Sequence, residues 1–538
     1  MKKITAVVLT GIMAAGTVMG MAACGEKDKI PDNVVADKYK ITVACQTEMG
    51  EEEVLKVLKK AYEEKNTNVE VEVKTFSGEG FEQYMLGIAA QNDSSPNIIW
   101  TADTYHSQWD QYFTDLRPYY EASEETDYSL YYETMLDAAA TNGYFKPTKN
   151  YKGEFRKNDL DTNSDGLEDY SKHSEYGLYY APRDYNKPAI LCNTHLFKDL
   201  DEAYERLYKE KNGAMSADYV SSSARLAEIV KGTEWDDLTD LSAFARMLGE
   251  RILYVVENAS TTRESNTWKN RAALDLFLEW EPTYTTIMNA MGIDLLSDKG
   301  ELQIAQYEEK FQELYDSMFP TDNEELGNNM VSPSIEFSSG NLMMTICSRP
   351  VVLGYGNTFK GSYGETSLQT ISIPVKDIAA GNSGYAISNI WNGKGMTVDG
   401  VYKSYNDLSW DFIKFIISEE GQEIAGETGL NIPVLKKLYS EETNGGKMPA
   451  WRKVESLGDM SHDAWVAGGE LRQDIFNIFI PEKRMTFRNE VRAFFVKMQS
   501  TNYYDYADKT GEETLADLIA ATVNGYKLQN PDKHLLQK

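Results

Sequence analysis

Carboxylate, amide and aromatic side chains gather where two predicted strands end. Gln46 and Glu48 follow the first strand pattern of the chain, and Trp100, Asp103 and Tyr105 lie at or just after the third. Carboxylates and amides form paired hydrogen bonds with hydroxyl edges, and aromatic planes stack on weakly apolar ring faces, so this set suits a sugar. The competing interpretations are a core position for Trp100 and helix-capping or solvated positions for the two acids.

Oxygen-bearing side chains alternate along a second segment, Asp161–Asp169, in which Gly166 stands where a loop would turn sharply. The spacing is similar to the first nine positions of an EF-hand calcium loop. Lys172 occupies the position of the bidentate glutamate of such a loop, so an Asp- and Asn-rich surface turn is the alternative. We expect a structural Ca²⁺ here and no catalytic cofactor. Its ligands would be Asp161, Asn163, Asp165, the carbonyl of Leu167, and Asp169.

The composition excludes several classes of protein. A chain of 538 residues allows about two to four domains with sizeable cores. Hydrophobic residues make up 42% and the mean hydropathy is −0.49, which excludes both a disordered chain and a multi-span membrane protein. Asp and Glu outnumber Lys and Arg by 84 to 54, and a net charge of −30 argues against a nucleic-acid partner.

The first residues have the pattern of an export signal. Two lysines precede an uncharged apolar stretch, residues 4–23, which ends in small residues. Cys24 follows two alanines and precedes a glycine, which resembles the box at which bacterial lipoproteins are cleaved and acylated, with methionine where leucine is usual. We expect removal of residues 1–23, a lipid anchor on Cys24 at the extracytoplasmic face of the membrane, and a flexible tether over 24–38. An uncleaved membrane anchor is the alternative.

The remaining cysteines, Cys45, Cys192 and Cys347, each lie in an apolar, strand-like run. We therefore expect buried free thiols, with one disulfide among them as the alternative. The sequence has no C-x-x-C motif and its five histidines are scattered, which argues against zinc.

The chain after the tether alternates between strand and helix patterns. Strands are predicted over 39–46, 69–75 and 97–100, and helices over 51–65 and 81–91. This order with short connections predicts a mostly parallel α/β sheet flanked by helices. Ligands bind at the carboxyl ends of the strands in such sheets, where the polar residues described first are placed.

Later parts of the chain return to α/β character. Short strands over 177–182 and 189–193 flank a predicted turn at 183–186, in which Arg183 and Asp184 can form a local ion pair. The other expected elements are a polar insertion at 142–176, a helical region over 198–318 with a loop at 258–270, strands over 342–346, 368–375 and 385–390, a helix over 409–418, and a mostly helical part over 448–528.

Five segments, in this order along the chain, resemble the extracellular solute-binding proteins of ABC importers, in the carbohydrate-binding family that includes maltose-binding protein. They are Pro96–Trp100, Gly177–Pro182 with Ile190–Asn193, Thr233–Leu238, Phe337–Met344, and Trp410–Gln422 with Gly429–Pro433. The resemblance covers nearly the whole chain after the export signal.

The resemblance implies a two-lobed fold like that of periplasmic binding proteins, in which each lobe is a mixed sheet flanked by helices around a ligand cleft. It implies a first lobe over 39–186 and 384–445, and a second over 187–383 and 446–538. Such a protein captures a carbohydrate and delivers it to a membrane permease, and the length of the chain favours an oligosaccharide. Lobe closure then carries the function without covalent chemistry, and we expect a monomer.

Further ligand-binding residues follow from the resemblance. Tyr185 and Asn186 lie where the chain would cross between lobes, and Trp280 and Trp391 are additional aromatic platforms. Arg349 stands where the family often carries a tryptophan, which suggests a polar or anionic sugar because arginine binds carboxylates in a fork. The alternatives are core packing for the aromatic residues and an ion pair with an acid of this chain for Arg349.

Two other functions stay open at this point. A surface glycoside hydrolase would need two carboxylates at strand ends, and no hydrolase motif is visible. A glycan-binding lipoprotein without a permease would share the fold and differ in its partner.

Overall fold

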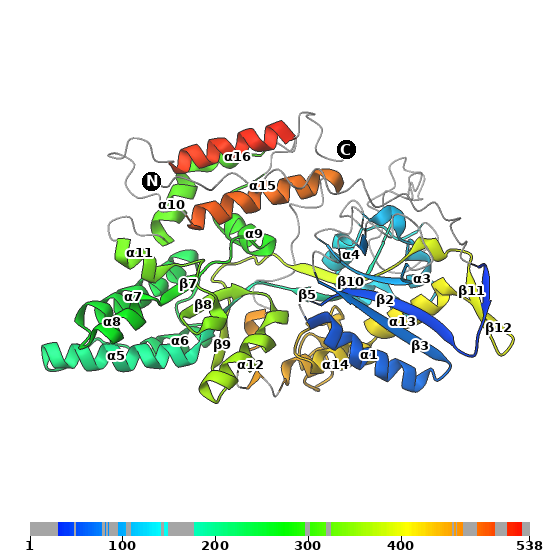
Figure 1. Cartoon of the computed structure of the whole chain (residues 1–538), viewed down its shortest axis with the longest axis horizontal. Coiled ribbons are helices and arrows are strands. Elements are labelled where there is room, and N and C mark those ends of the chain that lie inside the picture. Colours follow the sequence, from blue (N-terminus) through cyan, green and yellow to red (C-terminus); the bar gives the residue numbers. More distant parts are fainter. Residues whose placement is uncertain are drawn as a thin grey trace, which may run out of the picture.

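A computed structural model shows two lobes arranged along the long axis of the molecule (Figure 1). Each lobe contains its own sheet. The structure describes residues 31–47, 50–77, 81, 84–85, 95–103, 109–140, 145–148, 177–295, 302–318, 324–454, 457–458, 460–465, 481–500 and 514–529.

The first lobe is built on a five-stranded sheet with the order β3-β2-β4-β10-β5. β2 runs parallel to β3 and β4, as the strand–helix–strand pattern predicts, whereas β10 is antiparallel to both β4 and β5. A strand from late in the chain, β10, therefore lies between β4 and β5 and joins them into one sheet. The strands are β2 (Tyr39–Gln46), β3 (Val69–Phe76), β4 (Ile98–Ala102), β5 (Ala181–Asn186) and β10 (Gly381–Ile387).

Helices cover this sheet with faces that the sequence periodicity predicts. In α1 (Glu51–Lys65), the buried side chains recur at helical spacing and include Leu58 and Tyr62. Tyr62 meets Phe412 of α13 (Tyr405–Ile417) with ring centroids 4.9 Å apart. The other helices of this lobe are α3 (Arg117–Tyr120), α4 (Glu133–Ala138) and α14 (Glu419–Glu427).

The second lobe is built on a four-stranded mixed sheet with the order β7-β8-β6-β9. β6 is antiparallel to β8 and β9, while β7 is parallel to β8. The strands are β6 (Ala189–Asn193), β7 (Ala272–Asp275), β8 (Leu342–Cys347) and β9 (Leu368–Ile371). The helices are α5 (Thr194–Asn212), α6 (Ser222–Val230), α7 (Leu238–Asn258), α8 (Thr262–Lys269), α9 (Glu281–Ala290), α10 (Glu308–Met318), α11 (Glu324–Met330), α12 (Val352–Tyr363), α15 (Pro481–Ser500) and α16 (Leu515–Gln529).

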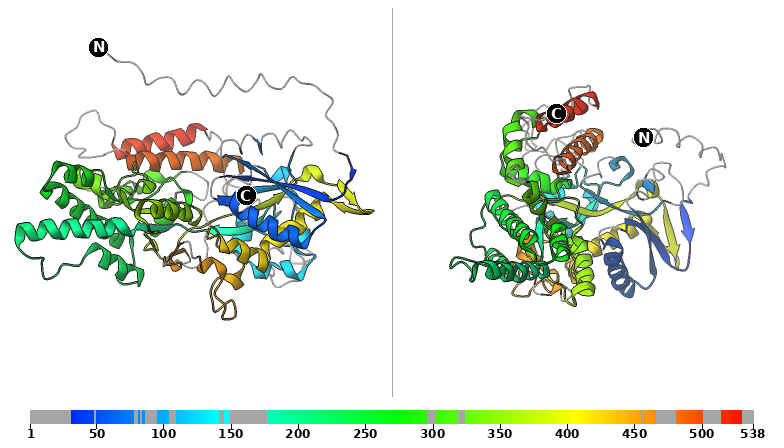
Figure 2. Two further views of the ribbon diagram at one scale, coloured as in Figure 1. Left: turned by 60° about the horizontal axis from the view of Figure 1, so that its bottom comes forward. Right: turned by 60° about the vertical axis from the view of Figure 1, so that its left-hand side comes forward.

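A small third sheet joins the start of the described chain to a late hairpin. β1 (Asn33–Val35) pairs in parallel with β11 (Gly395–Val398), which pairs with β12 (Val401–Ser404). This sheet lies at the end of the first lobe that is farthest from the second lobe (Figures 1 and 2). The Tyr39 hydroxyl links this third sheet to β2, because it donates a hydrogen bond to the Val401 carbonyl at 2.7 Å.

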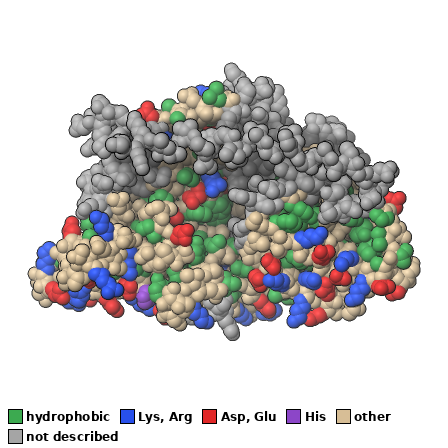
Figure 3. Space-filling model, in the orientation of Figure 1, with side chains coloured by type: hydrophobic (Ala, Val, Ile, Leu, Met, Phe, Trp, Pro, Cys, Tyr) green, Lys and Arg blue, Asp and Glu red, His purple; other side chains and the backbone are tan. Residues whose placement is uncertain are grey.

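Acidic and basic side chains are interspersed over the described surface of both lobes on the face shown in Figure 3. Among the described helices, none combines the length and apolar character that a membrane span requires. The three cysteines inside the described chain are buried and free, as expected.

The structure corrects several predicted elements. Residues 183–186 form the end of β5 and not a turn, because Glu51, Ser383 and the chain's own Asp184 satisfy the Arg183 charge inside the sheet. The predicted loop at 258–270 contains α8, and β7 interrupts the predicted helical region after it. A short buried apolar run such as β7 gives the same signal in a strand and in a helix.

Candidate functional site

Strand ends of the two sheets meet along one line across the molecule, which we call the seam. β5 ends at Asn186 and β6 begins at Ala189, with only two residues between them. Gly381 of β10 pairs with Asn186, and Cys347 at the end of β8 pairs with Ala189. Asp103 follows β4, and its amide donates to the carbonyl of the second residue of β10 at 3.2 Å. These five residues define the seam.

Asp103 reaches the second lobe at the seam. Its carboxyl group is buried, and a Cβ added at Gly381 would lie 3.5 and 3.6 Å from its two oxygens. The same Cβ would lie 3.8 Å from Cγ of Pro282, in the first turn of α9. Trp280 directly precedes α9, two residues before Pro282, and is partly exposed.

Asn382 holds the first-lobe side of the seam in place. Its side-chain carbonyl accepts a hydrogen bond from the Tyr180 hydroxyl, and its amide nitrogen donates to the Met135 carbonyl at 3.2 Å. Because all three groups are buried, this part of β10 is fixed against the helix α4 that contains Met135.

Arg349 lies on the second-lobe side of the seam, just after β8. It begins the short 3₁₀ helix η9 (Arg349–Val351), and its side chain is fully buried. One terminal nitrogen donates to the Trp451 carbonyl at 2.7 Å, and the other lies 3.0 Å from Nδ1 of His462. The guanidinium also lies 5.3 Å from the centre of the Trp451 ring. Burial, followed by the nearby Arg452, lowers the pKa of Arg349 to about 9.

A second cation and a tyrosine adjoin Arg349. The Arg452 guanidinium lies 4.6 Å from the centre of the same Trp451 ring, and it pairs with Asp463 at 2.6 Å. Tyr185 of β5 is buried, one residue before the seam residue Asn186, and it is among the groups that act on the pKa of Arg349. Burial raises the pKa of Tyr185 well above its usual range, which keeps the hydroxyl protonated.

A buried ion network fixes the other side of β5. Arg183 pairs with Glu51, the first residue of α1, and with Asp184 at 2.9 Å. Tyr385 of β10 donates to Glu51, and the Ser383 hydroxyl donates to Asp184 at 2.7 Å. The pair of Arg183 and Asp184 expected from the sequence is confirmed. The network also anchors the beginning of α1.

The seam thus combines carboxylate, amide, aromatic and guanidinium groups from both lobes. Within the described ranges, no cluster of three or more His, Cys, Asp and Glu side chains could hold a metal ion. Such a set of groups binds a polar organic molecule by hydrogen bonds and ring contacts.

A family model decides the class of protein to which this arrangement belongs. The model for bacterial extracellular solute-binding proteins matches residues 58–451, which include the second sheet, the first sheet apart from β2, and the seam. The chain is a member of that family. No curated protein sequence matches this solute-binding protein.

Solved structures share its fold. The GacH receptor of Streptomyces glaucescens, solved unliganded and with acarbose, has 13% identity and a TM-score of 0.54, and the match covers 92% of this chain and 99% of that chain. MalE of Bdellovibrio bacteriovorus bound to maltotriose has 11% identity and a TM-score of 0.53, covering 92% and 100%. Maltose-bound MalE3 of T. maritima has 14% identity and a TM-score of 0.51, covering 91% and 99%. These likenesses confirm the two-lobed fold of the solute-binding protein.

The structure brings part of the predicted ligand set together. Asp103 and Arg349 lie at the seam, Tyr185 and the backbone of Asn186 end β5 there, and Trp280 lies two residues before Pro282, which is close to Asp103. Gln46 ends β2, which runs parallel to β4, so it lies at the same edge of the first sheet and is partly exposed.

Two predicted aromatic platforms lie inside the first lobe. Trp100 is buried in β4, 6.0 Å from the ring of Phe81. Trp391, on the 3₁₀ helix η10 (Asn389–Trp391), lies beyond the end of β10 that points away from the seam. Its indole donates to the Pro96 carbonyl at 3.0 Å and packs on Tyr405. Both tryptophans are therefore packed in the core, which was the alternative to a ligand-binding role for them.

Other predicted residues lie outside the described part of the chain. They are the ligand candidates Glu48 and Tyr105, the lipidation residue Cys24, and the calcium ligands Asp161, Asn163, Asp165, Leu167 and Asp169.

Sequence reasoning missed the contribution of the segment after α14. Trp451, Arg452 and His462 reach the seam from this segment, and Asn382 reaches it from β10. The only available signal was the composition of the Trp451-Arg452 pair, because nothing local links it to Arg349, 102 residues earlier.

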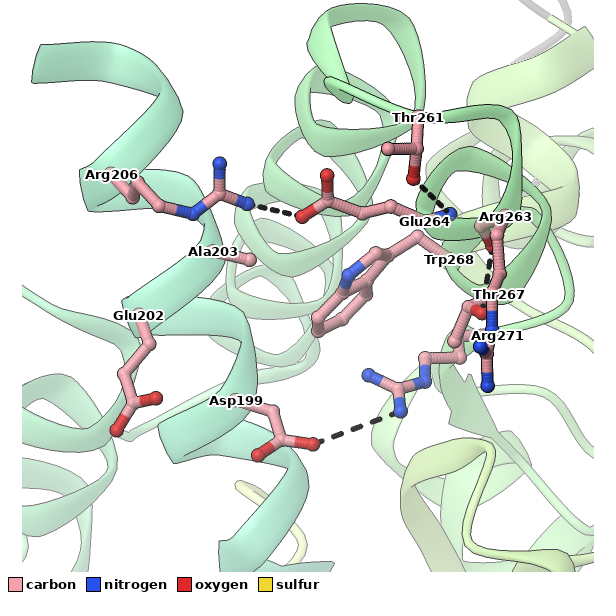
Figure 4. Close-up of a pocket in the computed structure, with 10 residues that line it drawn as sticks. All are labelled: Asp199, Glu202, Ala203, Arg206, Thr261, Arg263, Glu264, Thr267, Trp268 and Arg271. Carbon is pink, nitrogen blue, oxygen red and sulfur yellow. Dashed lines mark hydrogen bonds and ion pairs between the residues drawn. The ribbon is translucent and has the colours of Figure 1, made fainter. Parts of the chain in front are cut away.

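A separate pocket of about 570 Å³ lies at the opposite edge of the second sheet, between α5 and α8 (Figure 4). Arg271 stacks on Trp268 at 4.1 Å and lies 3.7 Å from Asp199, while Arg206 pairs with Glu264. Burial lowers the pKa of Arg271 from its usual value. Each of these two arginines has an acidic partner, so the pocket differs from the surroundings of Arg349.

Proposed function

We propose that this solute-binding protein captures a carbohydrate at the seam between its lobes. The observation that carries the proposal is that the buried Asp103 of the first lobe lies near Pro282 of the second lobe, two residues after Trp280. A carboxylate matches the hydroxyl edge of a sugar, and an aromatic ring matches its weakly apolar face. The sugars bound in the similar structures of GacH and of the two MalE proteins support this substrate class.

The mechanism is a shift between open and closed arrangements of the lobes. A sugar that contacts both sides of the seam stabilises only the closed arrangement, since only there do all contacts form at once. The short connection between β5 and β6 supports this proposal, because few backbone bonds separate the two sheets at that point.

We further propose that the closed form delivers an oligosaccharide to an ABC permease and leaves it chemically unchanged. The protein would act as a monomer on the extracytoplasmic face of the membrane, held by a lipid on Cys24. Membership of the solute-binding family supports the transport role, and the sequence around Cys24 supports the anchor.

A ligand screen tests the proposal. The protein is heated with neutral and acidic mono- and oligosaccharides, and the sugars are recovered and analysed afterwards. A ligand at about 100 times its Kd adds about 2.7 kcal/mol to the free energy of unfolding and raises Tm. We expect Tm to rise with one class of sugar, and we expect that sugar to be recovered unchanged.

Asp103→Asn should weaken that shift, while Asp399→Asn, on the distant β11–β12 turn, should leave it intact. Release of new reducing ends would instead indicate a glycoside hydrolase, and no shift with any sugar would contradict the proposal.

A further inference from the structure

Three arginines are among the largest fully buried side chains of the described structure: Arg117, Arg183 and Arg349. Arg117 pairs with Asp115 at 2.6 Å, and Arg183 pairs with Glu51 and Asp184. Among the described residues, no carboxylate lies within ion-pair distance of Arg349, and its Nε has no hydrogen-bond acceptor. The alternative expected from the sequence, an ion pair with an acid of this chain, is therefore absent from the described part.

The groups around Arg349 are neutral or positive. The Trp451 carbonyl and the Trp451 ring carry no charge, and Arg452 lies against the same ring. Burial, followed by Arg349 and Arg452, lowers the pKa of His462 to about 3, so the imidazole is neutral at pH 7. The one acid of this cluster, Asp463, pairs with Arg452, and its side chain is 82% exposed. Within the described part of the chain, the cluster therefore keeps one buried positive charge without a counter-charge.

An unbalanced buried charge is costly, and buried charges in proteins are normally paired. The chain has no shortage of acids, since 84 Asp and Glu residues give it a net charge of −30. Arg349 nevertheless stands at the seam, two residues after Cys347, with Nε as a donor that no described residue uses. A guanidinium in this state is suited to an oxyanion that arrives with a ligand.

We propose that the captured carbohydrate is an acidic saccharide, and that an anionic oxygen of its carboxylate or sulfate group accepts a hydrogen bond from Arg349. This inference rests on the proposed function and specifies its substrate class. Because Arg349 has no exposed surface in the present arrangement, the ligand reaches it when the seam opens and supplies the counter-charge when the lobes close.

The first test needs no variant. Oligosaccharides of galacturonic, glucuronic and mannuronic acid are each titrated into the protein beside their carboxyl-reduced, neutral forms, using calorimetry. Sulfated oligosaccharides form a second arm, which separates a carboxylate from a sulfate ester as the source of the oxyanion. We expect at least one acidic ligand to bind about 10- to 100-fold more tightly than its neutral form, as for a charge-assisted hydrogen bond formed out of water.

Variants then connect this preference to Arg349. Arg349→Gln should reduce the ratio of acidic to neutral affinity to about 3-fold or less, and Arg349→Lys should retain part of it. Arg271→Gln is the matched control, because Arg271 also stacks on a tryptophan but lies in the pocket between α5 and α8. That control should leave the ratio unchanged. If Arg349→Gln does not fold, the comparison of acidic with reduced ligands on the unaltered protein decides the question.

The outcomes separate this inference from the function on which it rests. Binding of neutral sugars with equal or higher affinity would overturn the acidic substrate and leave carbohydrate capture standing. An acidic preference that survives in Arg349→Gln would overturn the role of Arg349. If no saccharide of either kind binds, the proposed function itself fails.

Discussion

Glu51 and Arg183 form a buried ion pair across 132 residues of sequence. Glu51 begins α1, directly after the loop that leads from Gln46, and Arg183 lies in the strand that crosses toward the second lobe. The pair therefore couples the edge of the first sheet to the connection between the lobes. Asp184 and Tyr385 complete the network, so that both carboxylates have polar partners inside the lobe.

Arg183→Met should strongly destabilise the first lobe. The change leaves Glu51 and Asp184 buried without their cation, and breaking a buried pair in this way costs about 3–5 kcal/mol of the free energy of unfolding. Urea denaturation measures the loss. Arg206→Met removes the partly exposed pair with Glu264 and should cost about 1 kcal/mol or less. Similar losses in the two variants would contradict the role assigned to Arg183.

Gly384→Ala should also be destabilising. A Cβ at this position would lie 1.9 Å from the Ala181 carbonyl oxygen, at the point where the pairing of β10 with β5 shifts register. The two strands would have to separate, and forced overpacking of this kind costs about 1–3 kcal/mol or more. Gly381→Ala, three residues earlier in β10, serves as the control because its Cβ would make ordinary contacts at 3.5 Å or more. Thermal unfolding of both variants checks the prediction, and equal Tm values would refute it.

His462 should make the protein less stable in acid. Burial, with the nearby arginines, lowers its pKa to about 3, whereas an unfolded chain has a histidine pKa of about 6.5. Between these values only the unfolded chain binds the proton, so the free energy of unfolding falls as the pH drops from about 6.5 toward 3. In His462→Gln this contribution is absent, because glutamine does not titrate.

The measurement is Tm at pH 7, 6, 5 and 4 for both proteins. We expect the Tm of His462→Gln to fall less than that of the unaltered protein over this range. His195→Gln, which replaces a histidine with 37% exposure, should follow the unaltered protein. Parallel curves for all three would mean that His462 does not contribute to the acid sensitivity.

Calcium should stabilise the protein if the spacing of Asp161–Asp169 has the meaning assigned to it. Addition of Ca²⁺ to protein treated with a chelator should raise Tm by a few degrees, because binding to the folded state alone shifts the unfolding equilibrium. Asp161→Asn combined with Asp165→Asn should abolish this shift. Asp399→Asn is the control for loss of a single acid elsewhere. An equal Ca²⁺ effect in all proteins would place the ion at another site.

Local sequence patterns were sufficient to predict the strands and helices that are buried on one face or on all sides. The alternation in 39–46 and the helical spacing in 51–65 predicted β2 and α1 with their observed bounds, because each pattern records the face that packs on the core. The charged residues of β5 misled the same reasoning. Arg183 and Asp184 read as a turn, since their partners Glu51 and Ser383 lie more than a hundred residues away in sequence.

The site was predictable only to the extent that it follows strand ends. Asp103 was predicted to lie at this edge because it follows a buried strand, and Arg349 because it follows another strand at a position where the resembling family often carries a tryptophan; the structure places both at the seam. Trp451 and His462 could not be found in this way, because they belong to irregular segments and only the folded chain brings them to Arg349. Trp391 also follows a strand, but it lies at the end of β10 that is farther from the seam, and strand order alone does not distinguish the two ends.

The pairing of β1 with β11 determines where mechanical load enters the molecule. A pull on the residues before Asn33 passes through β1 into β11 and, by way of Tyr39 and Val401, into β2. All of these elements belong to one end of the first lobe, so the tension does not pass through the second lobe. With the protein held by the lipid proposed on Cys24, the second lobe would move without working against that anchor, and the holding force would not bias the proposed opening and closing.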